Sequence, residues 1–355
     1  MMLALTLMVS SCSPATEGQE GNDAWVTLTI STGGGAADGG EGMASRASGS
    51  AADKDWQVND LTIYIFDQTG QVIGSSYASY SINSKQDITA TVKTRKAQNC
   101  TVIALANAGT LSGTYATAQT TSPFAGVSTL SEFQQKYITF KDMASLESAP
   151  CLLMVGYLTG FDTTSSGSNI SLQRLASRLD FTITVNQDKV TGFPIVVDSY
   201  QLCHAPLSAY YASADMSSTG ITLPSGTSFV EYAANSTAFN SWTSGSNSQS
   251  YTAYVYANPA TTATDATYLL IKAHSQASNT DTRKIWQSEF KVYLTGITGL
   301  ADYQLLPNYH YTIGITVQGS ATEHNGVKTV YTAYPYYSSS LSAWGSNENR
   351  DLDMK

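Results

Sequence analysis

Charged side chains are scarce in this sequence of 355 residues: Asp, Glu, Lys and Arg together make up only 13%. Helices usually carry a charged face towards solvent, so this scarcity disfavours a helical bundle. The 18 basic residues are outnumbered by 27 acidic ones, and the net charge of −9 argues against a nucleic-acid partner, which requires a basic surface. The 22 tyrosines, with many Thr, Val and Ile residues, instead favour strands. These features predict an all-β surface protein.

Cysteine is also rare. The chain has four cysteines and no CxxC pair, namely Cys12, Cys100, Cys151 and Cys203. This number is too small for a secreted domain stapled by disulfides. The three cysteines after Cys12 are odd in number, so at least one thiol is free, and we expect it to be buried in a strand core. One disulfide among the three remains open.

Motifs that carry catalysis or bind cofactors are missing: the sequence has no HExxH, no GxSxG, no Walker loop and no GxGxxG before a helix. The four histidines do not have the spacing of metal ligands, and His310 lies on the polar side of its strand, where we expect it to be exposed. Asp53, Asp55 and Asp60 lack the pattern of a calcium loop and are expected to be solvated. We therefore predict no enzymatic activity, no metal and no cofactor.

The N-terminal segment indicates export. Met1–Val9 is apolar but too short to span a bilayer, and it fits the central region of a signal peptide. Small residues precede Cys12, and Val9 lies three positions ahead of it, an arrangement that resembles a bacterial lipobox. We predict a signal peptide over residues 1–11 and lipidation of Cys12. No Lys or Arg precedes the apolar run, which departs from the usual signal.

A polar tether leads from Cys12 to a first strand. Trp25–Ser31 alternates strictly, with Val26, Leu28 and Ile30 on one face, which predicts a half-buried strand. The residues that follow are rich in glycine, and Arg46 is the first basic residue of the chain. Proteases cut exposed segments of this composition. The first strand is thus joined to the rest of the chain by a cleavable linker.

The remainder of the chain shows many short segments with a period of two. Leu179–Val185 and Tyr309–Val317 alternate most clearly, and Cys100–Gly109 is apolar on both faces, which predicts a central strand. Thr129 and Glu132 have the spacing of a capping box, which predicts a short helix through Tyr137. Long loops are expected between Ser208 and Ser250. The pattern predicts an all-β fold of two β-sandwich domains in tandem, of transthyretin-like or Greek-key topology, with short helices in loops. The expected domains are residues 47–170 and 171–335, and the tail, 336–355, begins with more strand-like sequence.

Several segments, taken together and in order, resemble the fimbrillins, the lipoprotein pilins of the type V pili of some Gram-negative anaerobes. They span nearly the whole chain: the lipobox at Cys12, the strand Trp25–Ser31 before Arg46, and the segments Val58–Phe66, Val102–Gly109, Leu172–Phe181, Tyr254–Pro259 and Pro307–Tyr311, with Trp344 near the end. The stretch from Ser208 to Ser250 matches none of the family's features.

The resemblance implies a route of maturation. The lipidated precursor would reach the outer membrane, and an Arg-specific or trypsin-like protease would cut between Arg46 and Ala47. Residues 12–46 would then be a propeptide whose removable strand contributes Val26, Leu28 and Ile30. A C-terminal strand from a neighbouring copy, or from a related pilin, would replace it. The donor would lie in 336–355, with Tyr337, Leu341 and Ala343 as the expected contacts.

Physical chemistry supports strand replacement. Burial of three aliphatic side chains contributes about 5–9 kcal/mol, which is comparable to the whole stability of a domain. Loss of such a strand leaves an open edge that favours pairing with another chain. A head-to-tail contact of this kind propagates into a filament.

The main alternative is a monomeric outer-membrane lipoprotein that binds glycans or host proteins through its loops. In that case the first strand stays in place and Arg46 has no special role. A hydrolase on a β-sandwich is strongly disfavoured, because no acid–base pair or activated nucleophile is evident. The sequence does not separate shaft, tip and anchor roles or identify an adhesion receptor.

Overall fold

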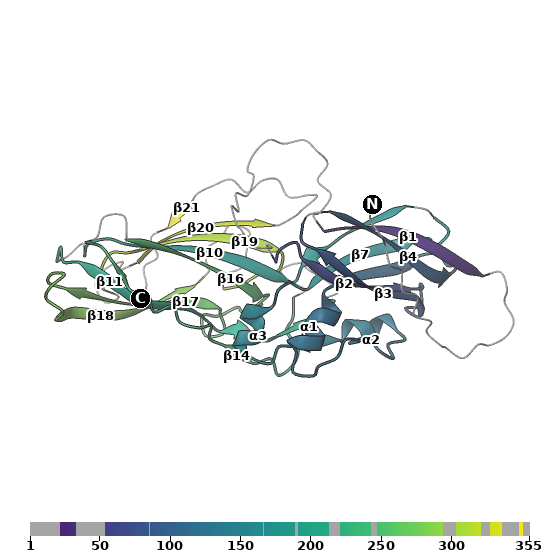
Figure 1. Cartoon of the computed structure of the whole chain (residues 1–355), viewed down its shortest axis with the longest axis horizontal. Coiled ribbons are helices and arrows are strands. Elements are labelled where there is room, and N and C mark those ends of the chain that lie inside the picture. Colours follow the sequence, from purple (N-terminus) through teal and green to yellow (C-terminus); the bar gives the residue numbers. More distant parts are fainter. Residues whose placement is uncertain are drawn as a thin grey trace, which may run out of the picture.

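The computed structural model describes residues 22–32, 54–84, 86–165, 167–188, 191–212, 221–242, 247–293, 303–320, 327–335 and 348–350. The molecule is elongated, and two groups of β-sheets lie end to end along it (Figure 1). The connections carry the short helices α1 (Ala108–Thr114), α2 (Leu130–Gln134) and α3 (Met143–Ser148). The predicted all-β, sandwich-like class with short helices is confirmed. The Greek-key topology and the residue limits of the two domains remain predictions.

Two sheets form the N-terminal half. The three-stranded sheet has the order β4 (Asp87–Arg95), β1 (Asp23–Ser31) and β8 (Ser168–Ser171). The five-stranded sheet has the order β3 (Val72–Ile82), β2 (Val58–Phe66), β5 (Cys100–Ala106), β7 (Met154–Phe161) and β9 (Gln173–Arg174). Apolar side chains of both sheets, among them Leu28 and Ile63, form one buried cluster. The half is therefore a sandwich whose core lies between its two sheets.

Two further sheets form the C-terminal half. The five-stranded sheet has the order β16 (Ser248–Tyr256), β10 (Ala176–Val185), β19 (Tyr309–Val317), β20 (Val327–Pro335) and β21 (Glu348–Arg350). The four-stranded sheet has the order β15 (Phe239–Asn240), β11 (Ile195–Cys203), β17 (Tyr268–Gln276) and β18 (Lys284–Tyr293). The alternating residues of β10 and β19 point into the core, as predicted: Leu179, Phe181, Ile183, Val185, Tyr311, Ile313, Ile315 and Val317 are buried.

Short strands occupy the long connections. β12 (Ala205–Pro206) pairs with β14 (Phe229–Val230), and β13 (Ser208–Tyr210) pairs with β6 (Tyr137–Thr139). Within the described residues between 208 and 250, strands are short until β16 begins at Ser248, as expected. No helix in the described part of the chain is long and apolar enough to cross a membrane.

The prediction of one strand over Cys100–Gly109 is wrong at its end, because β5 stops at Ala106. Asn107 has a left-handed backbone, with φ of 71°, and α1 begins at the next residue. The carboxylate of Asp60 accepts hydrogen bonds from the backbone N–H groups of Gly109 and Thr110, at 2.9 and 2.7 Å. A buried carboxylate at this helix start turns the chain away from the sheet. Asp60 is 1% exposed, so its predicted solvation is also wrong.

The predicted capping box is confirmed. The Thr129 hydroxyl accepts from the backbone N–H of Glu132, and the Glu132 carboxylate accepts from the backbone N–H of Thr129. The helix ends at Gln134, earlier than expected, because Tyr137 already belongs to β6. The three thiols of Cys100, Cys151 and Cys203 are free and buried, so the disulfide that the sequence left open does not form among them.

A buried arginine lies where the two halves meet. Arg174, at the end of β9, is 0% exposed, and its Nε donates to the backbone oxygen of Asp55 at 2.8 Å. Its guanidinium lies 4.6 Å from the ring centroid of Trp56. Arg178 on β10 reaches the Asp55 carboxylate at 3.3 Å. The segment that precedes β2 is thereby held against the strands that lead from the first half into the second. The predicted solvation of Asp55 is wrong, since this residue is 3% exposed.

A polar cluster continues this junction on the next strands. Asp180 accepts hydrogen bonds from Arg178 at 3.0 Å and from Thr252 at 2.7 Å, and it contacts Nε2 of His310 at 2.6 Å. The His310 side chain is only 22% exposed, so the prediction that it is exposed is wrong. Alternation placed His310 on the polar face correctly. It did not show that Asp180, two residues along β10 from the ladder partner Arg178, contacts the His310 ring.

Removal of the junction arginine should destabilise the protein. We expect Arg174→Ala to lower the free energy of unfolding by about 3 kcal/mol, because it removes charge-assisted hydrogen bonds from a buried site. Urea unfolding measures the difference. Arg95→Ala is the control, since the Arg95 side chain is 57% exposed and forms only a 3.8 Å ion pair with Asp67; it should cost less than about 0.5 kcal/mol. Equal losses in the two variants would contradict the role of Arg174.

Acid should weaken the cluster at Asp180. Burial raises the pKa of Asp180, but hydrogen bonds from His310, Thr252 and Arg178 outweigh it and hold the pKa at about 2. Because the pKa in the folded protein lies below the unfolded value of 3.8, the ionised Asp180 stabilises the fold at pH values above 3.8. This stabilisation is lost as the pH falls towards about 2. We expect a loss of about 2 kcal/mol across this interval, which Asp180→Asn should lack. Circular dichroism with urea at pH 4 and pH 2 measures it; an identical loss in both proteins would refute this origin.

Candidate functional site

The first strand occupies the middle of its sheet. β1 pairs antiparallel with β4 along its whole length, from Asp23 opposite Arg95 to Ser31 opposite Asp87. On its other side it pairs parallel with β8, from Leu28 to Ser31. β1 has no ladder with β2, the next strand of the described chain. The strand that lies before Arg46 in sequence is therefore held by two strands that come much later.

The inward face of β1 is fully buried. Val26, Leu28 and Ile30 have exposures of 1%, 0% and 0% and belong to the core cluster of the N-terminal half. On the outward face Thr27 is exposed, and Trp25 is 65% exposed. The structure thus brings together the three residues predicted for the removable strand. Burial of three such side chains is worth about 5–9 kcal/mol.

We call the position between β4 and β8 that β1 occupies the β1 slot. Both neighbours of the slot approach the opposite sheet at a glycine. A Cβ atom at Gly156 on β7 would lie 2.5 Å from Cγ2 of Ile170 on β8. A Cβ atom at Gly74 on β3 would lie 2.8 Å from the backbone oxygen of Lys93 on β4. These close approaches tie β4 and β8 to the five-stranded sheet by contacts that do not involve β1.

The two ends of β1 are fixed differently. At the start, the backbone N–H of Lys96 donates to the oxygen of Asn22 at 2.8 Å. At the end, the buried Thr32 hydroxyl donates to the backbone oxygen of Gln86 at 2.9 Å and accepts from its N–H at 3.0 Å. Sequence reasoning missed Thr32. Its one signal is its place two residues after Ile30, which continues the inward-facing series.

The other predicted site residues cannot be placed. The lipidation site Cys12, the cleavage site Arg46 and Ala47, and the donor-strand residues Tyr337, Leu341 and Ala343 lie outside the residues that the structure describes. Their roles remain predictions.

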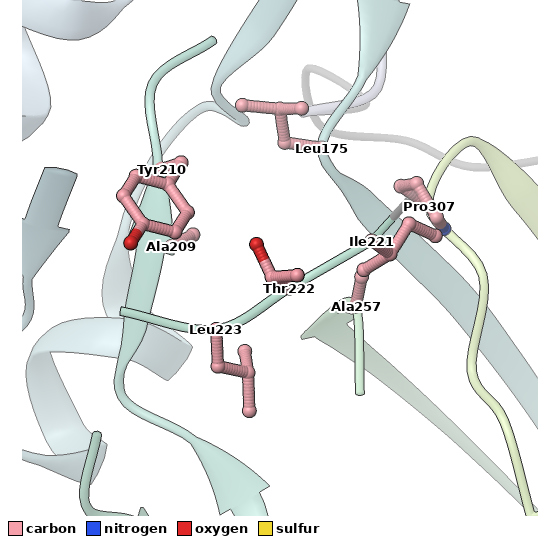
Figure 2. A pocket seen from close by; sticks show the side chains of 8 residues that line it. All are labelled: Leu175, Ala209, Tyr210, Ile221, Thr222, Leu223, Ala257 and Pro307. Atoms are coloured by element: carbon pink, nitrogen blue, oxygen red, sulfur yellow. The ribbon is translucent and has the colours of Figure 1, made fainter. Parts of the chain in front are cut away.

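A small pocket lies near the junction of the two halves (Figure 2). It encloses about 350 Å³, part of it open to solvent, and is lined by Leu175, Ala209, Tyr210, Ile221, Thr222, Leu223, Ala257 and Pro307. The Thr222 hydroxyl points into it, and no lining residue of the described chain is charged. Specific ligand sites usually combine apolar walls with convergent polar groups. This pocket offers few such groups for a glycan.

The described residues contain no cluster of three or more His, Cys, Asp or Glu that could hold a metal ion. His274 contacts Asp198 at 2.9 Å, and its other ring nitrogen contacts the Gln276 amide oxygen at 3.0 Å. Both ring nitrogens are thus engaged by structural partners. Burial raises the pKa of the Cys151 thiol to about 12, which keeps it protonated and unreactive at neutral pH.

Comparison with known proteins gives one family match. Residues 25–173 match the model of the major fimbrial subunit protein (FimA) family. The matched stretch begins within β1 and ends at β9, so it covers both sheets of the N-terminal half. No curated protein matches the chain.

Solved structures share the fold over most of the chain. A candidate cell adhesion protein from Parabacteroides distasonis is 18% identical, with a TM-score of 0.62, covering 89% of this chain and 99% of that one. The tip fimbrial protein Mfa3 from Porphyromonas gingivalis, with a C-terminal truncation, is 13% identical, with a TM-score of 0.53, covering 88% and 99%. A fimbrilin (FimA) from Porphyromonas gingivalis is 12% identical, with a TM-score of 0.53, covering 83% and 90%. At these identities the likeness establishes the fold alone.

Truncation of an inward-facing residue should weaken the β1 slot. We expect Leu28→Ala to lower the free energy of unfolding by about 2–5 kcal/mol, because it leaves a cavity in the core. Thr27→Ala, one residue away on the exposed face, should change it by no more than about 0.5 kcal/mol. Urea unfolding compares the two variants. A similar small effect of both would show that β1 is loosely packed.

Proposed function

Because residues 25–173 match the model of the major fimbrial subunit (FimA) family, we propose that the protein is a structural subunit of a cell-surface fimbria. Subunits of this kind assemble with other pilin subunits, and their role is structural rather than catalytic. Our finer proposal has three steps. The chain is exported to the outer membrane of a Gram-negative bacterium as a lipoprotein anchored at Cys12, it is cut after Arg46, and it polymerises by exchange of β1 for a strand of a neighbouring subunit, supporting adhesion.

The position of β1 carries this proposal. Arg46 lies between β1 and β2 in sequence, so a cut there leaves β1 held to the body by hydrogen bonds and apolar contacts alone. Its departure would leave the edges of β4 and β8 unpaired and would expose a core face. A strand of another chain, inserted between β4 and β8, restores both the ladder and the burial. The slot is therefore suited to accept a replacement.

The arrangement of the two halves supports a filament. β1 lies in one half of the elongated molecule, and the C-terminal strands β20 and β21 lie in the other (Figure 1). A donor strand that continues from the C-terminal half of one copy would meet the slot in the N-terminal half of the next. Such a contact uses two different surfaces, so it is head-to-tail and leaves both ends free to continue.

The alternative, a monomeric lipoprotein that binds glycans or host proteins, rests on one local feature. Tyr210, which lines the pocket, lies 6.1 Å from Tyr137, ring centroid to ring centroid, and Tyr137 is 51% exposed. Exposed tyrosines beside a pocket can stack against a sugar ring. The proposal of a fimbrial subunit explains β1, Arg46 and the family match together, whereas this alternative explains only the tyrosines.

Cleavage at Arg46 should trigger assembly. We expect brief trypsin treatment to yield a body that begins at Ala47 and a ladder of multimers on an unboiled denaturing gel. Arg46→Ala should abolish both, whereas the matched variant Arg46→Lys, which trypsin still cuts, should retain both. Mass spectrometry reads the new N-terminus. A cut at Ala47 that gives only monomer would argue for a tip or capping subunit, and an uncut Arg46 in a folded body would favour the monomeric lipoprotein.

A further inference from the structure

Thr32, immediately after β1, is fully buried at 0% exposure. Its backbone N–H donates to the oxygen of Gln86 at 3.2 Å, and its hydroxyl both donates to that oxygen and accepts from the Gln86 N–H. We call this arrangement the Thr32 subsite. It continues the inward-facing series of β1, so the slot receives three aliphatic side chains followed by one hydroxyl.

The alternation of β1 excludes some shifts of the strand but not others. A shift by one residue would place Thr27 and Thr29 in the core, which the period of two forbids. A shift by two residues keeps the same face inward. It also keeps the same pairs of residues hydrogen-bonded, because antiparallel ladders alternate with a period of two. The aliphatic residues alone therefore do not select one register.

The Thr32 subsite disfavours the two registers that differ from the native register by two residues. In one direction Ile30 moves to the place of Thr32, and the Gln86 backbone groups lose their hydroxyl partner. In the other direction Thr32 moves to the place of Ile30, and its hydroxyl enters an apolar core without a partner. The first shift removes two part-buried hydrogen bonds from Gln86, and the second leaves a hydroxyl unsatisfied in the core, so each shift costs free energy.

The contacts at the start of β1 distinguish the native register from a shifted one only weakly. The contact of Asn22 with Lys96 uses backbone atoms, which any residue supplies. The ion pair of Asp23 with Lys93, at 2.8 Å, joins side chains that are 63% and 59% exposed, and such pairs contribute little.

We propose that Thr32 fixes the register of β1, and that the same subsite selects a Ser or Thr at the corresponding place of any strand that replaces β1. The second part rests on the proposed function. The slot thus favours a strand with the pattern aliphatic-x-aliphatic-x-aliphatic-x-hydroxyl. A strand with three matching aliphatic residues but no hydroxyl at the last position would also pair with β4 in registers shifted by two residues.

Disulfide trapping in the intact chain tests the register. Thr32–Gln86 and Asn22–Lys96 are hydrogen-bonded pairs, so Thr27 and Thr91 form a non-hydrogen-bonded pair, in which Cβ atoms lie closest. The full chain with Cys12→Ser, Thr27→Cys, Thr91→Cys and Lys93→Cys offers residue 27 two partners on the exposed face. Residue 91 reports the native register and residue 93 reports a shift by two, and mass spectrometry of the oxidised protein measures their ratio.

Thr32→Val should favour the shift. With Val at this position, Leu28, Ile30 and residue 32 can fill the three aliphatic sites in the shifted register. We expect the ratio of the 27–93 to the 27–91 disulfide to rise about tenfold, equivalent to about 1.4 kcal/mol. Thr32→Ser keeps the hydroxyl and should keep the native ratio, as should Thr29→Val, the same chemical change on the other face. A ratio unchanged by Thr32→Val would overturn the proposal.

A second arm tests selection of the replacing strand. Synthetic peptides of residues 23–32, with Thr32 or with Val in its place, are added during cleavage by trypsin. We expect the native peptide to suppress multimers at a concentration at least tenfold lower. Equal suppression would overturn selection by the subsite. A cut protein that forms no multimers would refute the proposed function and would leave the register result, obtained on uncut chain, unaffected.

Discussion

The backbone of β1 needs hydrogen-bonding partners on both of its sides, and the sheet that contains it depends on this need. β4 and β8 come from parts of the chain that are far apart, and β1 is the strand that joins them into one sheet. Its aliphatic face closes the core against the five-stranded sheet at the same time. β1 comes first in the sequence and is indispensable to the sheet. The strands that follow it in the chain hold it only by hydrogen bonds and side-chain contacts. This combination makes replacement by another strand physically reasonable.

The surroundings of β1 are fixed by contacts of their own. Gly156 and Gly74 let β8 and β4 lie directly on the opposite sheet, and Arg174 fastens the chain beyond β8 to the segment that precedes β2. Because these contacts do not involve β1, they favour a slot that keeps its shape while its occupant changes. A slot formed only by its occupant would collapse on itself.

Local pattern was enough to predict much of the fold. Strict alternation placed β1, β10 and β19 with their inward residues, and the spacing of Thr129 and Glu132 predicted α2. The all-β class followed from composition. These features depend on residues close together in sequence, where periodicity and capping act.

The errors and omissions involve partners that are distant in sequence. Asp60 ends β5 early by capping a helix at Gly109, and His310 is covered because Asp180 lies on the neighbouring strand. Thr32 owes its role to Gln86, across the ladder, and Gly156 owes its role to a strand that passes over it. No spacing rule links such residues. The three inward-facing aliphatic residues of β1 were therefore predictable, whereas the contact of Thr32 and the close approaches at the glycines were not.

The segment that Arg174 holds has a further consequence for a mature subunit. The described chain resumes at Lys54, whose ammonium lies 4.5 Å from the ring centroid of Tyr254 and donates to the backbone oxygen of Glu147. The residues just after the linker are therefore fastened at the waist of the molecule rather than at either tip. In a filament of cut subunits, the described body of each subunit would begin beside this waist, once per subunit. A dye or affinity tag attached there would decorate the fibre at intervals of one subunit without obstructing the ends through which the subunits join.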